Sequence, residues 1–334
     1  MTDLTTLEAE TYQKPRNQWW DVWDQFKTHK GALIGAAFFI FVLIFVFLGP
    51  IFWTLDAQYI DIRARSQGPS LAHPMGTDQL GRDTLARIMV GGQTSLLVGL
   101  TAMLLALIVG TLVGVLAGYF KRLDGILMRL TDLFLALPLL PLLLVIIMLF
   151  RDTLRAQFGP EKGIFILIVF VIGITSWMQT ARIVRGDVLA LKEREFVLAA
   201  RSIGTSPFKM IQRHLLPNVL SPIMVSATLG LANAIITESA LSFLGLGFPS
   251  DFPTWGKLLF DSVDRMVNYP ERVLWPGLCI SFTVLSVNYI GDGLRDALDP
   301  RIRGRCPPRK DFSCPSRIVS PNSTPRCASG VMTS

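Results

Sequence analysis

The ionisable residue best placed to do chemistry is Glu238, which closes an uncharged run of residues 215–237. Asn233 and Thr237 come just before it, so three polar side chains gather at one end of an apolar segment. A carboxyl group near hydrocarbon is costly and usually faces a water-filled cavity or a partner. Two interpretations stay open. Either Glu238 and Asn233 line a path through a membrane, or Glu238 sits at the outer interface, hydrated or paired with a basic residue.

The sequence motifs of common enzyme sites are missing. It contains no GxxxxGK[ST] phosphate loop, so nothing predicts ATP binding by this chain. HExxH, GxSxG and paired histidines at metal-ligand spacing are also missing, and His29, His73 and His214 are scattered. Three of the four cysteines fall in the last thirty residues without CxxC spacing, which argues against a zinc site. We expect no catalytic site, no cofactor and no metal.

The composition indicates a membrane protein. Of the 334 residues 51% are hydrophobic and only 17% are charged, and the mean hydropathy is +0.46. Soluble domains carry about 25% charged residues. The first thirty residues are polar and the apolar run after them is too long for a signal peptide, so we expect no cleavable signal.

Six uncharged runs are long enough to cross a bilayer, which takes about 17–25 residues. They cover residues 31–55, 88–120, 133–150, 163–181, 215–237 and 273–291. Pro138 and Pro141 predict a kink or an unwound turn in the third run. The sequence therefore predicts an all-α polytopic membrane protein with six transmembrane helices.

The distribution of Lys and Arg predicts the orientation. If the N-terminus is inside, the inside segments hold 22 of the 32 basic residues. Cytoplasmic loops carry such an excess, so we expect both termini in the cytoplasm and residues 56–87 in an extracytoplasmic loop. The same asymmetry explains the net charge of +7 without nucleic-acid binding. In residues 1–30 an amphipathic stretch carries Trp19, Trp20, Trp23 and Phe26, and we expect it to lie along the membrane lipid.

Three glycines in the second run, Gly110, Gly114 and Gly118, fall four residues apart. Small residues at this spacing let another helix approach closely in lipid. We expect them to form a helix interface, within the chain first and between subunits second.

The segment of residues 189–217 is basic and reads as two short helices with a stop between them. Phe196, Ala199, Ala200 and Ile203 share one helical face, and Gly204 can end that helix. Ser206 is suited to cap a second helix that starts at Pro207. Its apolar stripe is Phe208, Ile211 and Leu215, and Pro217 restricts its continuation. An ordinary positive-inside loop and a docking surface both fit this pattern.

Ala199, Ala200, Gly204, Leu216 and Pro217 make this segment similar to the EAA loop of permease subunits of binding-protein-dependent ABC importers. In that family the loop docks into a cytoplasmic ATPase. The resemblance implies docking by residues 182–217. The docking residues would be Glu195, Ala199, Ala200, Gly204, Pro207, Phe208, Ile211, Leu216 and Pro217. Two positions depart from the family pattern, because Leu198 stands where it has Glu and His214 where it has Ile.

Three further segments resemble the oligopeptide/dipeptide/nickel branch of these permeases. Residues 75–83 read MGTDQLGRD, residues 242–247 read SFLGLG and residues 291–300 read GDGLRDALDP. The first and last clusters also read as tight turns, in which Asp and Thr satisfy local backbone donors. The resemblance covers residues 30–303, with a permease core at 88–303. We expect residues 304–334 to be a disordered cytoplasmic tail.

The resemblance implies a type I ABC importer permease fold in the bacterial inner membrane, working by alternating access. The expected partners are a second related permease, two cytoplasmic ATPases and an extracytoplasmic solute-binding protein. Peptides are the expected cargo, and Glu238 would then meet a peptide's amino group. Nickel or another small solute is the alternative cargo. A self-contained secondary transporter and a membrane scaffold are the rival classes.

Overall fold

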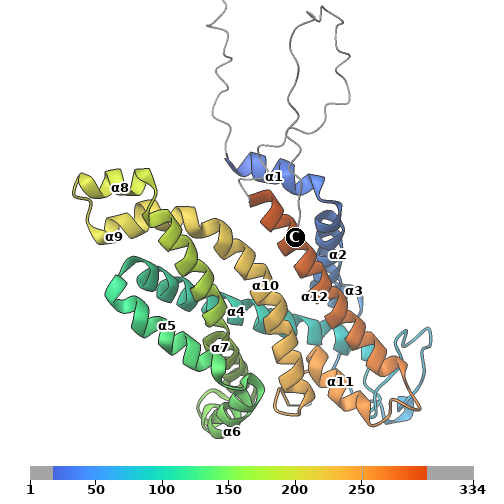
Figure 1. The fold of residues 1–334 in the computed structure, drawn as a ribbon. Helices are drawn as coiled ribbons and strands as arrows, with labels where there is room; N and C mark the ends of the chain where they lie inside the picture. The colour runs from blue at the N-terminus through green and yellow to red at the C-terminus, as the bar shows by residue number, and fades with distance from the viewer. Residues whose placement is uncertain (1–17, 250, 299–334) are drawn as a thin grey trace, which may run out of the picture. The chain divides into compact units, whose positions relative to one another are not determined.

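The computed structural model describes residues 18–249 and 251–298, so the predicted tail lies outside the described residues. The helices of this part, shown in Figure 1, are α1 (Gln18–Thr28), α2 (Lys30–Phe47), α3 (Gly49–Phe52), η2 (Ile62–Ala64), α4 (Thr84–Tyr119), α5 (Lys121–Ala136), α6 (Leu139–Phe158), α7 (Pro160–Lys192), α8 (Glu195–Ser202), α9 (Pro207–Met210), η3 (Ile211–Leu215), α10 (Leu216–Phe243), α11 (Trp255–Val263) and α12 (Glu271–Leu298).

Five helical runs in the described ranges are long and apolar enough to cross a membrane. They are α2, α4, α7, the run Pro207–Phe243 and α12. The bent pair α5 and α6 makes a sixth if it is one span. The prediction of an all-α polytopic membrane protein is therefore confirmed.

The predicted kink in the third run is a complete break. α5 and α6 meet at 89° around Leu137 and Pro138, both in extended conformation. Proline lacks a backbone N–H and disfavours a helical residue before it, which ends α5 here. α6 then folds back on α7 through Gly159, and Leu143 and Ile147 are buried in their shared core. The interruption predicted from Pro138 is therefore confirmed, and it separates two helices instead of kinking one.

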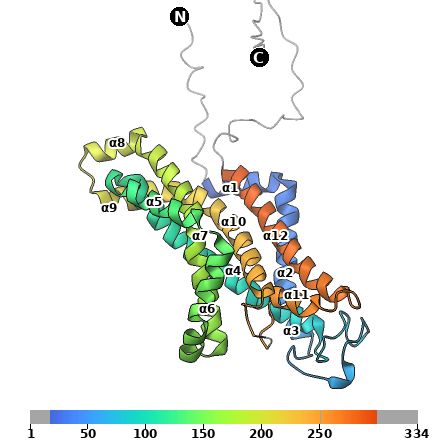
Figure 2. The same ribbon diagram turned by 60° about the horizontal axis from the view of Figure 1, so that its bottom comes forward.

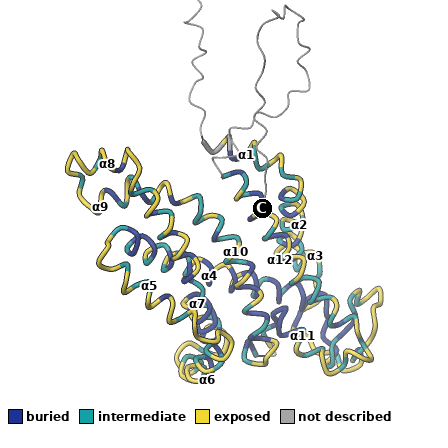
Figure 3. Tube along the Cα trace, viewed as in Figure 1, coloured by how far each residue is buried: buried dark blue, intermediate teal, exposed yellow. Residues whose placement is uncertain are grey.

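α4 is the helix around which the others pack. It contacts α7 most extensively, and it also contacts α10, α2 and α11. Its 36 residues would extend about 54 Å, so it must tilt in a bilayer or project beyond it. The buried residues in Figure 3 concentrate where these helices meet, while α5, α6, α8 and α9 are largely exposed.

Several helices run past the predicted spans. α7 continues eleven residues beyond residue 181 and carries Arg185, whose guanidinium donates to the Asp124 carboxyl of α5 at 2.5 and 2.8 Å. A run without charges marks only the part of a helix that hydrocarbon can cover, so charged helix ends escape such a prediction. The first span is shorter than predicted, because α2 ends at Phe47.

The tight turn predicted at residues 291–293 is wrong, because α12 stays helical through Leu298. A Cβ on Gly291 would lie 2.4 Å from the Thr228 hydroxyl of α10, and one on Gly293 would lie 2.2 Å from the Ala32 Cβ of α2. These glycines serve close helix packing. The predicted turn at residues 76–78 is confirmed, with Gly76 at φ +74 and Asp78 accepting from the backbone N–H of Leu80.

The amphipathic N-terminal stretch forms α1, which packs on α12 and α2. Val22 is buried against them, whereas Trp20 and Trp23 are exposed on the other side. The Lys27 ammonium lies 5.2 Å from the Trp23 ring centroid. Figures 1 and 2 show α1 and the α8–α9 segment toward one end of the helices and α11 toward the other.

Candidate functional site

The segment predicted to be two short helices is a helical hairpin, α8 to η3, here called the α8–α9 hairpin (Glu195–Leu215). α8 ends in a pair of backbone bonds typical of a Schellman motif, from Thr205 N–H to Ala200 O and from Gly204 N–H to Arg201 O. Gly204 adopts φ +85 with no atom within 4 Å of a Cβ built on it. The glycine is therefore favoured by its backbone conformation, not by crowding.

The outer side of this hairpin carries large apolar side chains that the rest of the described chain leaves exposed in large part. Phe196 is 44% exposed, Ile203 86% and Phe208 73%. Together with the exposed Leu198 we call these residues the outer patch. Isolated exposed apolar residues are common on proteins, but several on one short hairpin mark an interaction surface.

The inner side of the hairpin anchors it to the helix core. Val197, Met210 and Leu215 are buried in one cluster with Val184 and Val188 of α7. At the base of the hairpin the Lys192 ammonium donates to the Tyr119 carbonyl of α4 at 3.0 Å. The outer patch is thus held on a packed support and not on a loose loop.

The other predicted docking residues take different positions on the hairpin. Glu195 and Ala199 are exposed, and Ala200 and Ile211 are partly buried against the core cluster. Ser206 occupies the N-cap position without a side-chain bond, and Pro207 is the first residue of α9.

The second helix of the hairpin does not stop at Pro217. A π-helical turn, in which Leu216 N–H bonds to Ile211 O, carries the chain directly into α10. The wider turn changes the hydrogen-bond register just before Pro217, which lacks an N–H. α8, α9 and α10 therefore follow from α7 with two short breaks, at residues 193–194 and 203–206.

A cavity of about 320 Å³ lies between α5, α6, α7 and α10. Asn233 and Thr237 line it together with Ser226, whose buried hydroxyl has no partner among the described residues. Its remaining polar side chains come from α7, and they are Thr175, Ser176, Gln179 and Thr180. Every lining residue is uncharged, so the wall offers neutral hydrogen-bonding groups among apolar ones.

Glu238 does not join Asn233 at this cavity. It is fully buried, and its carboxyl oxygens accept from the Ser95 hydroxyl at 3.1 Å and from the Ser242 hydroxyl at 2.7 Å. The expectation that Glu238 and Asn233 line one path therefore does not match this arrangement. Among the described residues Glu238 has no basic partner; hydroxyl groups inside the protein satisfy its carboxyl group instead.

Gly110, Gly114 and Gly118 all face α7. A Cβ on Gly110 or Gly114 would lie 2.7 Å from a backbone carbonyl oxygen of α7, and one on Gly118 would lie 2.7 Å from the Val188 side chain. The interface is thus within the chain, and it lets α4 and α7 pack backbone to backbone.

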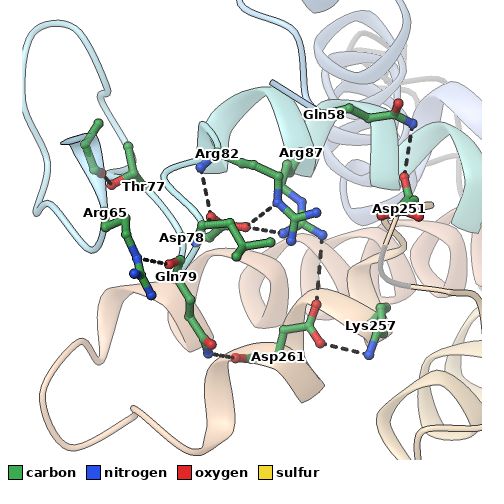
Figure 4. A network of polar contacts seen from close by, with 12 residues as sticks. Gln58, Arg65, Thr77, Asp78, Gln79, Arg82, Arg87, Asp251, Lys257 and Asp261 are labelled. Carbon is green, nitrogen blue, oxygen red and sulfur yellow. Dashed lines mark hydrogen bonds and ion pairs between the residues drawn. The ribbon is translucent and has the colours of Figure 1, made fainter. Parts of the chain in front are cut away.

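A polar network at the α11 end was not foreseen from the sequence (Figure 4). Arg87, at the start of α4, contacts the Asp78 carboxyl at 2.5 Å and the Asp261 carboxyl of α11 at 3.9 Å. Asp261 also pairs with Lys257 at 2.8 Å, and Arg82 pairs with Asp78 at 2.7 Å. The i,i+4 spacing of Asp78 and Arg82, and an arginine just before an apolar run, were the available signals.

These arginines change the acidity of Asp78. Burial alone would raise the pKa of the Asp78 carboxyl. The charge of Arg87, with the hydrogen bonds and charge of Arg82, outweighs burial and holds that pKa below its ordinary value of 3.8. The carboxylate thus ties the loop before α4 to the helix itself.

Comparison with known proteins gives a consistent result. Residues 106–304 match the family described as "Binding-protein-dependent transport system inner membrane component". Residues 17–69 match "N-terminal TM domain of oligopeptide transport permease C".

Three relatives cover most of the chain. The oligopeptide transport system permease protein OppC of Bacillus subtilis is 35% identical over 87% of this chain and 92% of its own length. The dipeptide transport system permease protein DppC of Alkalihalophilus pseudofirmus is 37% identical over 85% and 90%. The glutathione transport system permease protein GsiD of Escherichia coli is 38% identical over 89% and 96%.

Proposed function

Because the chain belongs to the family of inner membrane components of binding-protein-dependent transport systems, we propose that it carries peptides as the permease subunit of an ATP-driven importer. Membership makes it a multi-pass inner membrane protein and a pore subunit rather than an enzyme. The peptide cargo is supported by the names of its relatives, which are oligopeptide, dipeptide and glutathione permeases.

The observation that carries this proposal is the outer patch of the α8–α9 hairpin. It presents Phe196, Leu198, Ile203 and Phe208 to a partner, and a cytoplasmic ATPase is the partner that suits it. Since the hairpin joins α7 to α10, a displacement of the patch acts on both helices. Those two helices also supply most of the polar wall of the cavity.

The cavity suits a cargo of variable charge. Neutral groups such as Gln179, Thr180 and Asn233 can bond peptide amides, and they impose no charge requirement on the side chains. A second related permease would complete the path opposite this wall. Alternating access then requires that ATP binding favour one orientation of α7 and α10 over the other.

The proposed orientation places the α8–α9 hairpin and both termini in the cytoplasm. The Lys and Arg distribution supports it. Two cytoplasmic ATPases would then dock at the hairpins of the two permeases. The α11 end, with residues 53–83, would face the extracytoplasmic binding protein.

The decisive experiment replaces Ile203 and Phe208 together with Asp. Ile211 is left intact because it packs against the core cluster. Val267→Asp is the matched control, since Val267 is 92% exposed in the connection between α11 and α12. The tagged chain is purified from membranes, and we score retained ATPase protein and peptide uptake.

We expect the double variant to insert into the membrane normally. The amount of ATPase protein that it retains and its peptide uptake should each fall roughly tenfold or more, since burying a charge at an apolar contact is costly. The control should keep the ATPase, because Val267 lies in the α11–α12 connection and not on the hairpin. Normal ATPase retention and uptake in the double variant would refute the docking assignment. A chain that transports alone without ATP would favour a secondary transporter instead.

A further inference from the structure

A second cavity, of about 290 Å³, lies at the α11 end of the molecule. It is formed by the loop before α4, the first turns of α4 and α12, and α11. Its apolar wall consists of Leu80, Ile88, Leu258, Phe260 and Pro276. None of its lining residues belongs to the uncharged cavity between α5, α6, α7 and α10. Any ligand here would therefore bind away from that cavity.

Arg272 lines this cavity with a buried charge. The residue is only 5% exposed, and neither Nη1 nor Nη2 has a hydrogen-bond partner among the described residues. Its guanidinium carbon lies 4.1 Å from the Tyr269 ring centroid. The aromatic ring covers one face of the planar group, and the buried N–H edge has no hydrogen-bond partner in the described chain.

The carboxyl groups of the cavity lining are already engaged or exposed, and the neighbouring Glu271 attracts the Arg272 charge without forming an ion pair with it. Asp78 pairs with Arg82 and Arg87, and Asp261 pairs with Lys257 at 2.8 Å. Asp264 is exposed. No ion pair to Arg272 is present among residues 18–249 and 251–298. A buried guanidinium without an anion is unfavourable, so the site has the chemistry of one that awaits a ligand.

We propose that this cavity is a carboxylate-binding site, in which Arg272 holds the terminal carboxylate of a short peptide. A guanidinium edge offers two parallel N–H donors that match a carboxylate. The apolar wall suits the side chain next to that carboxylate. The proposal rests on the orientation proposed above, in which the cavity opens to the extracytoplasmic side, and it gives the permease a recognition site of its own.

The test measures binding of trialanine and of trialanine C-terminal amide to the full-length chain in lipid nanodiscs, by titration calorimetry. The variant is Arg272→Gln, which keeps much of the volume and removes the charge. Arg265→Gln is the matched control, because Arg265 lies outside the lining and donates to the Ser66 hydroxyl. Ser262→Phe is a second variant that fills the cavity from its wall without touching Arg272.

We expect the amide to bind the wild type roughly tenfold or more weakly than the free acid, which is the usual effect of losing a charge-assisted bond. Arg272→Gln and Ser262→Phe should each lose the preference for the acid, whereas Arg265→Gln should keep it. Arg272→Gln without peptide should melt no lower than the wild type, because it removes a buried charge without a partner.

Equal binding of acid and amide, or an unchanged preference in Arg272→Gln, would overturn the proposal. The proposal would also be overturned if the wild-type chain bound no peptide and the Arg272→Gln variant no longer bound the solute-binding protein. That result would assign Arg272 to an acidic side chain of the binding protein. ATPase retention scored on the same preparations keeps this outcome separate from the importer assignment.

Discussion

The Ser95 hydroxyl of α4 lies 3.1 Å from Oε2 of Glu238 in α10 and donates a hydrogen bond to it. The Ser95 hydroxyl oxygen in turn accepts from the backbone N–H of Trp255, the first residue of α11, at 3.2 Å. On the other side Ser242 donates to Oε1 of Glu238 and accepts from the Thr254 hydroxyl at 3.3 Å. The carboxyl group thus holds the start of α11 through two hydroxyls, where a helix N-terminus favours an acidic group.

This arrangement predicts different effects for two substitutions of Glu238. Glu238→Ala leaves the Ser95 and Ser242 hydroxyls without acceptors and should lower the stability by about 2–4 kcal/mol. Glu238→Gln keeps one acceptor and should cost only about 1 kcal/mol. Thermal denaturation in detergent measures both.

The uptake assay separates this role from a role in transport. Glu238→Gln should carry peptides of different charge as the wild type does, because Glu238 lies outside the uncharged cavity. Asn233→Leu, which alters the cavity wall, is the comparison and should reduce uptake. If Glu238→Gln changed the preference for peptides of one charge over another, the carboxyl group would have to take part in transport.

Close packing of α4 on α7 predicts that Gly114→Ala lowers the stability of the protein. The new Cβ would lie 2.7 Å from the Ala181 carbonyl oxygen, so the helices must separate, at a cost of about 1–3 kcal/mol. Gly186→Ala is the matched control in a helix interior, because no atom lies within 4 Å of its Cβ. It should be neutral or stabilising by up to about 1 kcal/mol. Equal melting temperatures for the two variants would contradict the close packing seen here.

Local signals in the sequence were enough for much of the fold. The long apolar runs predict the spans, Pro138 predicts the break before α6, and Gly204 predicts the stop between α8 and α9. Each of these depends on residues close together in the chain, where backbone chemistry decides the outcome.

Contacts between segments that are distant in the chain could not be predicted from the sequence. Ser95 and Glu238 are 143 residues apart, and the backbone N–H of Trp255 is 160 residues from Ser95. A polar residue near an apolar run can face a path or a buried partner, and its sequence neighbourhood is the same in both cases. Gly291 and Gly293 were read as a turn for a related reason, since the helices they contact are not visible locally.

The left-handed conformation of Gly204 predicts that a β-branched residue there is strained. Gly204→Val should cost about 1–3 kcal/mol, whereas Gly204→Asn should cost less because Asn tolerates this region. Gly204 itself is not part of the core cluster, so membrane insertion should persist while ATPase retention and peptide uptake fall. Gly125→Ala in α5, where a Cβ meets no atom within 4 Å, is the control. Wild-type ATPase retention and peptide uptake in Gly204→Val would show that transport does not depend on the geometry of the hairpin.

The lowered pKa of Asp78 predicts a pH-dependent contribution to stability. Since its pKa in the folded protein lies below the ordinary value of 3.8, the charged form stabilises the fold above that value. The contribution is lost as the pH falls through the lower, folded pKa.

At neutral pH Asp78→Asn should destabilise by about 3 kcal/mol, because the buried Arg87 loses its closest carboxylate. As the pH falls below about 4 the wild type should approach the variant. Thermal denaturation of both proteins between pH 3 and 7 measures the difference, with Asp264→Asn as an exposed control that should track the wild type. A gap between wild type and Asp78→Asn that stays constant down to pH 3 would contradict the ion pair.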